Sequence, residues 1–186
     1  MRLSLALAAL LALTACGGDT PPAPTGGGSA PVAGKPAATL LADADTAEQA
    51  GDWKTVLACA TGALADAKAT GDEKQEAWLR RIAAEAHVNG TDGAKAALTQ
   101  MTASSDVPAA GKLVSLATDL AGNDQAAAAV EVVATADARY GSDPATKRQL
   151  KKVAKMCQTK LTESGDAGAL DKLAALGYLS ASDDEE

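Results

Sequence analysis

The chain has 186 residues, with 17 basic against 24 acidic residues and a formal net charge of -7, and its length suits one folded domain. The negative balance argues against nucleic acid as a partner, because binding to phosphates depends on clustered Lys and Arg. Aromatic residues make up 2% of the chain and Phe is absent, which argues against aromatic ligand cages and predicts a core of Ala, Leu, Val and Ile.

The beginning of the chain has the layout of an export signal. Arg2 supplies a positive start, an apolar run covers residues 3–13, and small residues surround Cys16. The run has only about ten residues, whereas a helix that crosses the hydrocarbon core of a membrane needs roughly 20. The segment is therefore too short for a permanent membrane span and is typical of a signal peptide.

The order Leu13-Thr14-Ala15-Cys16 resembles the lipobox of bacterial lipoproteins. The resemblance implies that residues 1–15 are removed and that Cys16 carries a diacylglycerol and a fatty acid such as palmitate. Several acyl chains anchor durably, because each buried methylene adds about 0.8 kcal/mol. Gly17, where Asp would retain the protein in the inner membrane, implies anchoring to the outer membrane facing the periplasm. An ordinary secretory peptide and a buried N-terminal helix are the alternatives.

Residues 16–37 follow the signal and consist largely of Gly, Pro, Ser, Thr and Ala. The segment has no periodic apolar face, so it cannot bury enough surface to offset the entropy of ordering it. It is expected to be a disordered tether with a typical reach of about 25 Å between the lipid and the folded part.

Residues 38–180 are expected to form an α-helical domain, because apolar residues recur three or four positions apart and no alternating strand pattern competes. The stripes are Trp53, Val56, Leu57, Ala60 and Leu64; Trp78, Leu79, Ile82, Ala83 and Ala86; Ala94, Ala97, Leu98 and Met101; Leu113, Leu116, Ala117 and Leu120; Ala129, Val130, Val133 and Ala136; Leu150, Val153, Cys157 and Leu161; and Leu170, Leu173 and Ala174. Seven or eight helices are predicted.

Related turns separate these stripes. They are Gly51-Asp52, Gly90-Thr91-Asp92, Gly122-Asn123-Asp124 and Gly165-Asp166. At each turn the Gly is expected to end one helix in a left-handed conformation, and the short polar residue to cap the next helix. The glycines are roughly 30 to 45 residues apart, which is the range of helical-hairpin repeats.

The first hairpin resembles a tetratricopeptide repeat. The resemblance is carried by the run from Ala47 to Trp53, by small residues at Ala60 and Ala63, and by the Glu76-Ala77-Trp78 start of the second unit. It implies an array of antiparallel helical hairpins that offers a concave groove to peptides. A compact helical bundle is the alternative, since the later units lack the aromatic residue after the Gly.

Candidate chemistry is sparse. His87 is the only histidine, and it precedes Asn89-Gly90 at a predicted helix end, where it is expected to bond the last carbonyl groups. The sequence has no phosphate-binding Gly loop, no His-Glu-x-x-His and no paired-Cys metal spacing. We therefore expect neither an enzyme nor a bound cofactor or metal.

Cys59 and Cys157 would both be exported into an oxidising space, where a pair invites a disulfide. They belong to the first and fourth hairpins, and bonded cysteines need Cα atoms within about 7 Å. A compact bundle would permit the bond, whereas an open array would leave both residues as small core side chains.

Two charged segments stand out. A basic group occupies one helix, on positions away from its apolar stripe: Lys147, Arg148, Lys151, Lys152, Lys155 and Lys160. It is either a solvated helix face or a docking surface for an acidic partner, anionic head groups or cell-wall carboxylates.

Residues 181–186 are expected to form an acidic disordered tail. Before that tail, Gly177 is expected to end the last helix so that Tyr178 folds over its apolar face.

Together these patterns predict a lipid-anchored envelope protein whose helical domain is an adaptor or scaffold for another envelope protein. Tetratricopeptide-like lipoproteins often assist the assembly of envelope complexes, and the resemblance implies such a role here. The alternative is a structural or small-ligand-binding helical bundle without a dedicated protein partner.

Overall fold

The computed structural model describes residues 34–179, which form seven α-helices and no β-strand, so the predicted all-α class is confirmed. The helices are α1 (Ala37–Gln49), α2 (Trp53–Ala65), α3 (Gly71–Ala103), α4 (Ala110–Gly122), α5 (Ala126–Tyr140), α6 (Pro144–Ser164) and α7 (Ala167–Ala175). The predicted signal segment 1–15, Cys16, most of the tether and the acidic tail 181–186 lie outside the described residues.

Polar residues cap α2 and α7 where the sequence predicted them, whereas α5 begins at Gln125 without a side-chain cap. The carboxylate of Asp52 accepts a hydrogen bond from the backbone N–H of Thr55 at 3.1 Å, at the start of α2. Asp166 does the same for Ala169 at 3.0 Å, at the start of α7. Gly51, with φ 71°, reverses the chain between α1 and α2. These contacts satisfy backbone groups that a helix end leaves without partners.

The turn between α4 and α5 differs from the prediction. Gly122 does not adopt a left-handed conformation but is the last residue of α4, and Asp124 has φ 59° instead. The backbone N–H of Gln125 bonds the carbonyl of Leu120 at 2.9 Å, and the left-handed residue lies two positions later than expected. Asp tolerates the left-handed region better than most residues, because its short polar side chain bonds locally.

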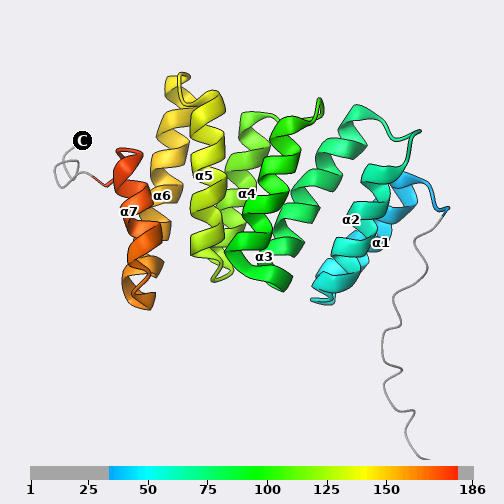
Figure 1. The fold of residues 1–186 in the computed structure, drawn as a ribbon, viewed down its shortest axis with the longest axis horizontal. Helices are drawn as coiled ribbons and strands as arrows, with labels where there is room; N and C mark the ends of the chain where they lie inside the picture. The colour runs from blue at the N-terminus through cyan, green and yellow to red at the C-terminus, as the bar shows by residue number, and fades with distance from the viewer. Residues whose placement is uncertain (1–33, 180–186) are drawn as a thin grey trace, which may run out of the picture.

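Gly90 divides α3 into a first arm (71–89) and a second arm (91–103). Its backbone angles, φ 69° and ψ -159°, lie outside the helical region. The chain descends through the first arm and ascends through the second, so the two arms form a hairpin of their own (Figure 1). The sequence predicted a helix on each side of this turn, and the two arms correspond to them.

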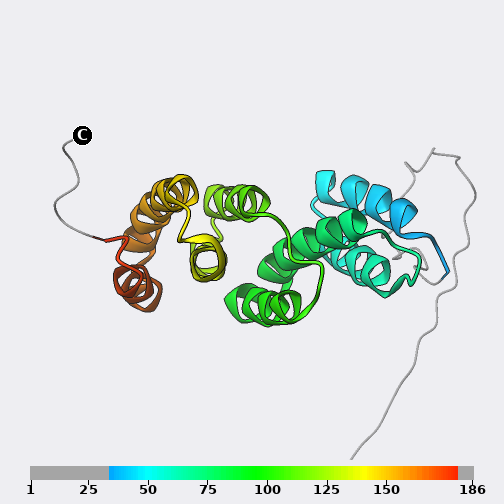
Figure 2. The same cartoon turned by 90° about the horizontal axis from the view of Figure 1, so that it is seen from above.

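The helices follow one another in chain order along the long axis of the molecule (Figure 1). Each helix packs against its neighbour in sequence, and several also pack against the next but one: α1 against α3, α3 against α5, α4 against α6 and α5 against α7. Viewed from above, the helices form two staggered layers (Figure 2). The described part of the chain therefore begins and ends at opposite ends of an elongated array.

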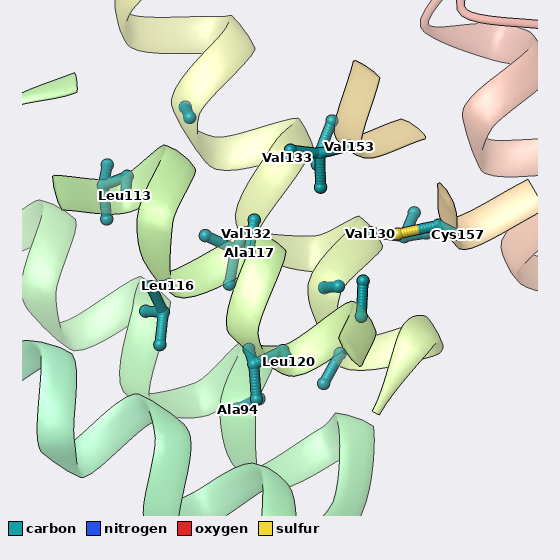
Figure 3. Packing of buried hydrophobic residues seen from close by; sticks show 14 of the residues in the cluster. Ala94, Leu113, Leu116, Ala117, Leu120, Val130, Val132, Val133, Val153 and Cys157 are labelled. Carbon is teal, nitrogen blue, oxygen red and sulfur yellow. The ribbon is translucent and has the colours of Figure 1, made fainter. Parts of the chain in front are cut away.

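Two hydrophobic cores fill the array. The small core lies among α1, α2 and the first arm of α3 and is rich in Ala. The large core extends from the first arm of α3 to α7, and Figure 3 shows side chains of α4, α5 and α6 within it, with Val130 and Val133 of α5 beside Cys157 and Val153 of α6. Leu64 packs against both cores. Small Ala side chains let these helices approach closely, which compensates for the scarcity of aromatic residues.

Candidate functional site

A cleft of about 300 Å³ lies where α1, α2, the first arm of α3 and α4 meet. We call it the central cleft; its lining residues are Glu48, Trp53, Glu76, Leu79, Arg80, Ala83, Lys112, Ser115, Leu116 and Asp119. Trp53 packs against the small core, whereas Leu79, Ala83 and Leu116 pack in or against the large core. A ligand in the central cleft would therefore contact both halves of the array.

Trp53 is held beside the cleft by a stacking contact. Its indole lies against the imidazole of His87, with ring centroids 3.9 Å apart and an angle of 7° between the ring planes. Trp53 is the first residue of α2, directly after the N-cap Asp52, and His87 comes from the first arm of α3. A helix start and a neighbouring helix thus fix the orientation of the indole that lines the cleft.

The predicted role of His87 at a helix end is wrong. Within residues 34–179 its ring makes no hydrogen bond to a carbonyl, because the side chain points to α2 and stacks there. Burial lowers the pKa of His87, and the negative charge of Glu48 opposes that shift. The neutral ring is therefore favoured in the folded protein.

Arg80 forms a charged cluster next to the indole. Its side chain is 16% exposed and its guanidinium pairs with Glu48 at 2.7 Å, with Glu76 at 3.1 Å and with Asp45. The Nε atom is buried and has no hydrogen-bond partner in the described structure. One cation faces three carboxylates, so this side of the central cleft keeps a surplus of negative charge.

The structure gathers most of the predicted basic group on one face of α6. Lys147, Arg148, Lys151, Lys152 and Lys155 are exposed there, and we call these five residues the basic face. Lys160 differs, because it lies on another side of the helix and pairs with Asp124 at 2.7 Å. Asp124 precedes α5, so Lys160 links α6 to the rest of the array and is separate from the basic face.

Both cysteines of the described domain are free and buried. Cys59 belongs to the small core and Cys157 to the large core, so the two thiols lie in different parts of the array. Burial raises the pKa of Cys59, and it raises the pKa of Cys157 to about 11. The sequence left open either a disulfide or two separate core side chains. In the structure both cysteines are small core residues without a disulfide.

Other features of the described residues offer less to a ligand. Hollows of about 550 and 580 Å³ lie at the ends of the hairpins and are lined chiefly by turn residues and Ala. Within residues 34–179, no group of three or more His, Cys, Asp or Glu side chains is arranged to hold a metal ion. No helix in the same range has the length and apolar character needed to cross a membrane.

Comparison with protein-family models, with curated proteins and with solved structures gives no match for this chain. The function is therefore inferred from the geometry of the central cleft and of the basic face.

The sequence placed Trp53 and Trp78 on equivalent apolar stripes, and it could not separate their roles. In the structure Trp78 is 8% exposed and belongs to the large core, whereas Trp53 is partly exposed and lines the cleft.

Proposed function

We propose that this protein is a lipid-anchored adaptor of the cell envelope that binds a peptide segment of another envelope protein in the central cleft. The observation that carries the proposal is the cleft itself. It combines an indole of fixed orientation with apolar side chains from two further elements and charged groups of both signs. Aromatic side chains that are held rigid are effective anchors for a protein partner, because little conformational entropy is lost on binding.

The order of packing supports a tetratricopeptide-like array. Four hairpins follow each other, made by α1 and α2, by the two arms of α3, by α4 and α5, and by α6 and α7. Contacts between elements two apart in sequence stack each hairpin on the next, as expected when each repeat touches only its neighbours. In such an array the helices of one layer line a surface on which a peptide can lie.

The chemistry of the cleft limits the type of peptide. Leu79 and Leu116 line the cleft together with the indole and provide apolar surface, so the peptide should insert one apolar side chain. The carboxylates around Arg80 outnumber its charge, and Asp119 and Lys112 add one charge of each sign, so a basic residue beside the apolar one would be favoured. We propose a short segment with an apolar residue next to Lys or Arg, bound without any catalytic step.

The anchor at Cys16 sets where this binding would occur. With residues 1–15 removed and Cys16 acylated, the tether would hold the array near the outer membrane on its periplasmic side. Replacing Cys16 with Ser tests this part by cell fractionation. The variant should leave the membrane fraction, and unchanged membrane association would contradict the anchor.

A photoreactive residue in the cleft tests the adaptor role. Ser115 lines the central cleft, whereas Gln100 is exposed on the second arm of α3 and does not. A benzoylphenylalanine at position 115 should give a discrete crosslinked product in native membranes, and one at position 100 should not. Trp53→Ala should weaken the product from position 115. Equal products from both positions, or a product that Trp53→Ala leaves unchanged, would contradict binding in the cleft.

A further inference from the structure

Three residues of the basic face, Lys147, Arg148 and Lys152, differ from the paired cations of the domain. Arg80, Lys160 and Lys172 each pair with a carboxylate from another part of the array. Within residues 34–179, no carboxylate forms an ion pair with Lys147, Arg148 or Lys152, all of which are exposed. The basic face thus concentrates five positive side chains on an acidic protein, and three of them have no carboxylate partner within residues 34–179.

The spacing of these residues makes them one continuous surface. Lys147, Lys151 and Lys155 are four residues apart and form one row along α6, and Arg148 and Lys152 form the adjacent row. The opposite side of the helix, with Leu150 and Cys157, is buried in the large core. At about 1.5 Å per residue, the rows extend along roughly 12 Å of helix.

The described chain ends close to this surface. α7 runs back along α6 for nine residues, which brings its end to about the level of Lys155. Beyond α7, the hydroxyl of Tyr178 donates a hydrogen bond to Asp137 at 2.6 Å, near the end of α5 that leads into α6. Leu179 packs against the large core. The exit of the chain is thereby fixed beside the first half of α6, as Figure 1 also shows.

An acidic segment follows this exit in the sequence. Residues 183–186 are Asp, Asp, Glu and Glu, and only three residues separate them from Leu179. Seven extended residues span up to roughly 24 Å, so 183–186 can reach every member of the basic face. A short connection also keeps the effective concentration of a tethered segment in about the millimolar range, which favours it over free anions.

We propose that the acidic segment 183–186 docks on the basic face of α6 in the same molecule. Four carboxylates then lie against five cations, and the segment shields the face from anionic lipid head groups near which the anchor would hold the domain. This contact is independent of the central cleft, because it involves the opposite end of the array. It would make the basic face available to an external anionic surface only when the segment is displaced.

Zero-length carbodiimide crosslinking of the full chain tests the proposal, since it joins a Lys amine to a carboxylate only when the two are in contact. Mass spectrometry of the monomer should show segment 183–186 joined to Lys147, Lys151 or Lys155. The double variant Arg148→Gln/Lys152→Gln removes charge but keeps those three reporters, and it should lower the yield about threefold to tenfold. Salt at about 1 M should also lower it, because the Debye length falls to about 3 Å.

The matched control is Lys54→Gln/Lys95→Gln, which changes net charge equally at exposed positions on α2 and α3. It should leave the yield unchanged. Equal losses in the two double variants, or no crosslink from 183–186 to α6, would overturn the proposal. Sedimentation with phosphatidylglycerol vesicles tests whether the segment covers the basic face against anionic lipid. Replacing the Asp and Glu residues of 183–186 with Asn and Gln removes their charge and should increase vesicle binding several-fold. Unchanged binding would show that the segment does not cover the basic face.

Discussion

The indole of Trp53 lies flat against the imidazole of His87, with ring centroids 3.9 Å apart, and this contact joins the start of α2 to the first arm of α3. The stack fixes one side of the indole and leaves the other part of the ring to line the central cleft. A partly buried and neutral His suits this role, because a charged imidazolium would need a partner for its second proton. The same contact therefore orients the indole that lines the cleft and makes the stability of the fold depend on pH.

The stack predicts a stability that depends on the protonation of His87. Burial lowers the folded-state pKa below the ordinary value of 6.5, so the unfolded chain binds more protons between the two pKa values. Stability from this group rises as pH increases through that window and is lost as pH falls through it. His87→Phe keeps a ring for stacking but cannot titrate. Urea unfolding at about pH 7.5 and 5.5 should show a smaller acid loss for His87→Phe than for the unmodified chain, and equal losses would contradict the role of His87.

Because Cys59 and Cys157 are buried in different cores, we expect a protein without a disulfide between its hairpins. Burial raises the pKa of both thiols, to about 11 for Cys157, so little reactive thiolate exists at neutral pH. In a Cys16→Ser chain, a thiol reagent should modify neither Cys59 nor Cys157 in the folded state and both after denaturation. If denaturation without reductant exposes no thiol, the two residues are bonded.

The local features of the fold could be predicted from sequence because they depend on neighbours in the chain. The caps at Asp52 and Asp166 and the reversal at Gly90 follow from a polar side chain or a Gly at a helix end. The turn at Asp124 was misplaced by two residues, since Asp can also adopt the left-handed conformation.

The candidate sites depend on contacts between distant residues, which periodicity does not report. Trp53 and Trp78 occupy similar stripes, and only the position of α4 leaves the first of them in a cleft. Lys160 belonged with the basic residues of α6 by sequence, but it pairs with Asp124, 36 residues away. The ring of His87 likewise finds its partner on another helix.

Leu150 and Met156 provide a paired test of the orientation of α6. Leu150 is fully buried in the large core, whereas Met156 is 42% exposed on the same helix. Leu150→Ala should lower the free energy of unfolding by about 2 to 5 kcal/mol, because it removes apolar contacts and leaves a cavity. Met156→Ala should change it by less than about 0.5 kcal/mol. Urea titrations of the two variants measure both values, and similar losses would mean that α6 presents a different face to the core.

The end of the array provides a test of how the last hairpin is closed. Gly177 has φ 76°, and the backbone N–H of Tyr178 bonds the carbonyl of Leu173 at 3.1 Å, which ends the final helix and turns the Tyr ring into the large core. Burial and the hydrogen bond to Asp137 raise the pKa of Tyr178, so its hydroxyl stays protonated and continues to donate.

Gly177→Ala should cost about 1 to 2 kcal/mol through backbone strain at positive φ. Tyr178→Phe should cost about 0.5 to 1.5 kcal/mol through the lost hydrogen bond. Because α7 is the last described helix and packs only on α5 and α6, these losses should appear first as faster amide exchange in α7, while amides of α2 keep their protection. Equal acceleration in α2 and α7 would mean that the array unfolds as one unit and that its end has no separate closure.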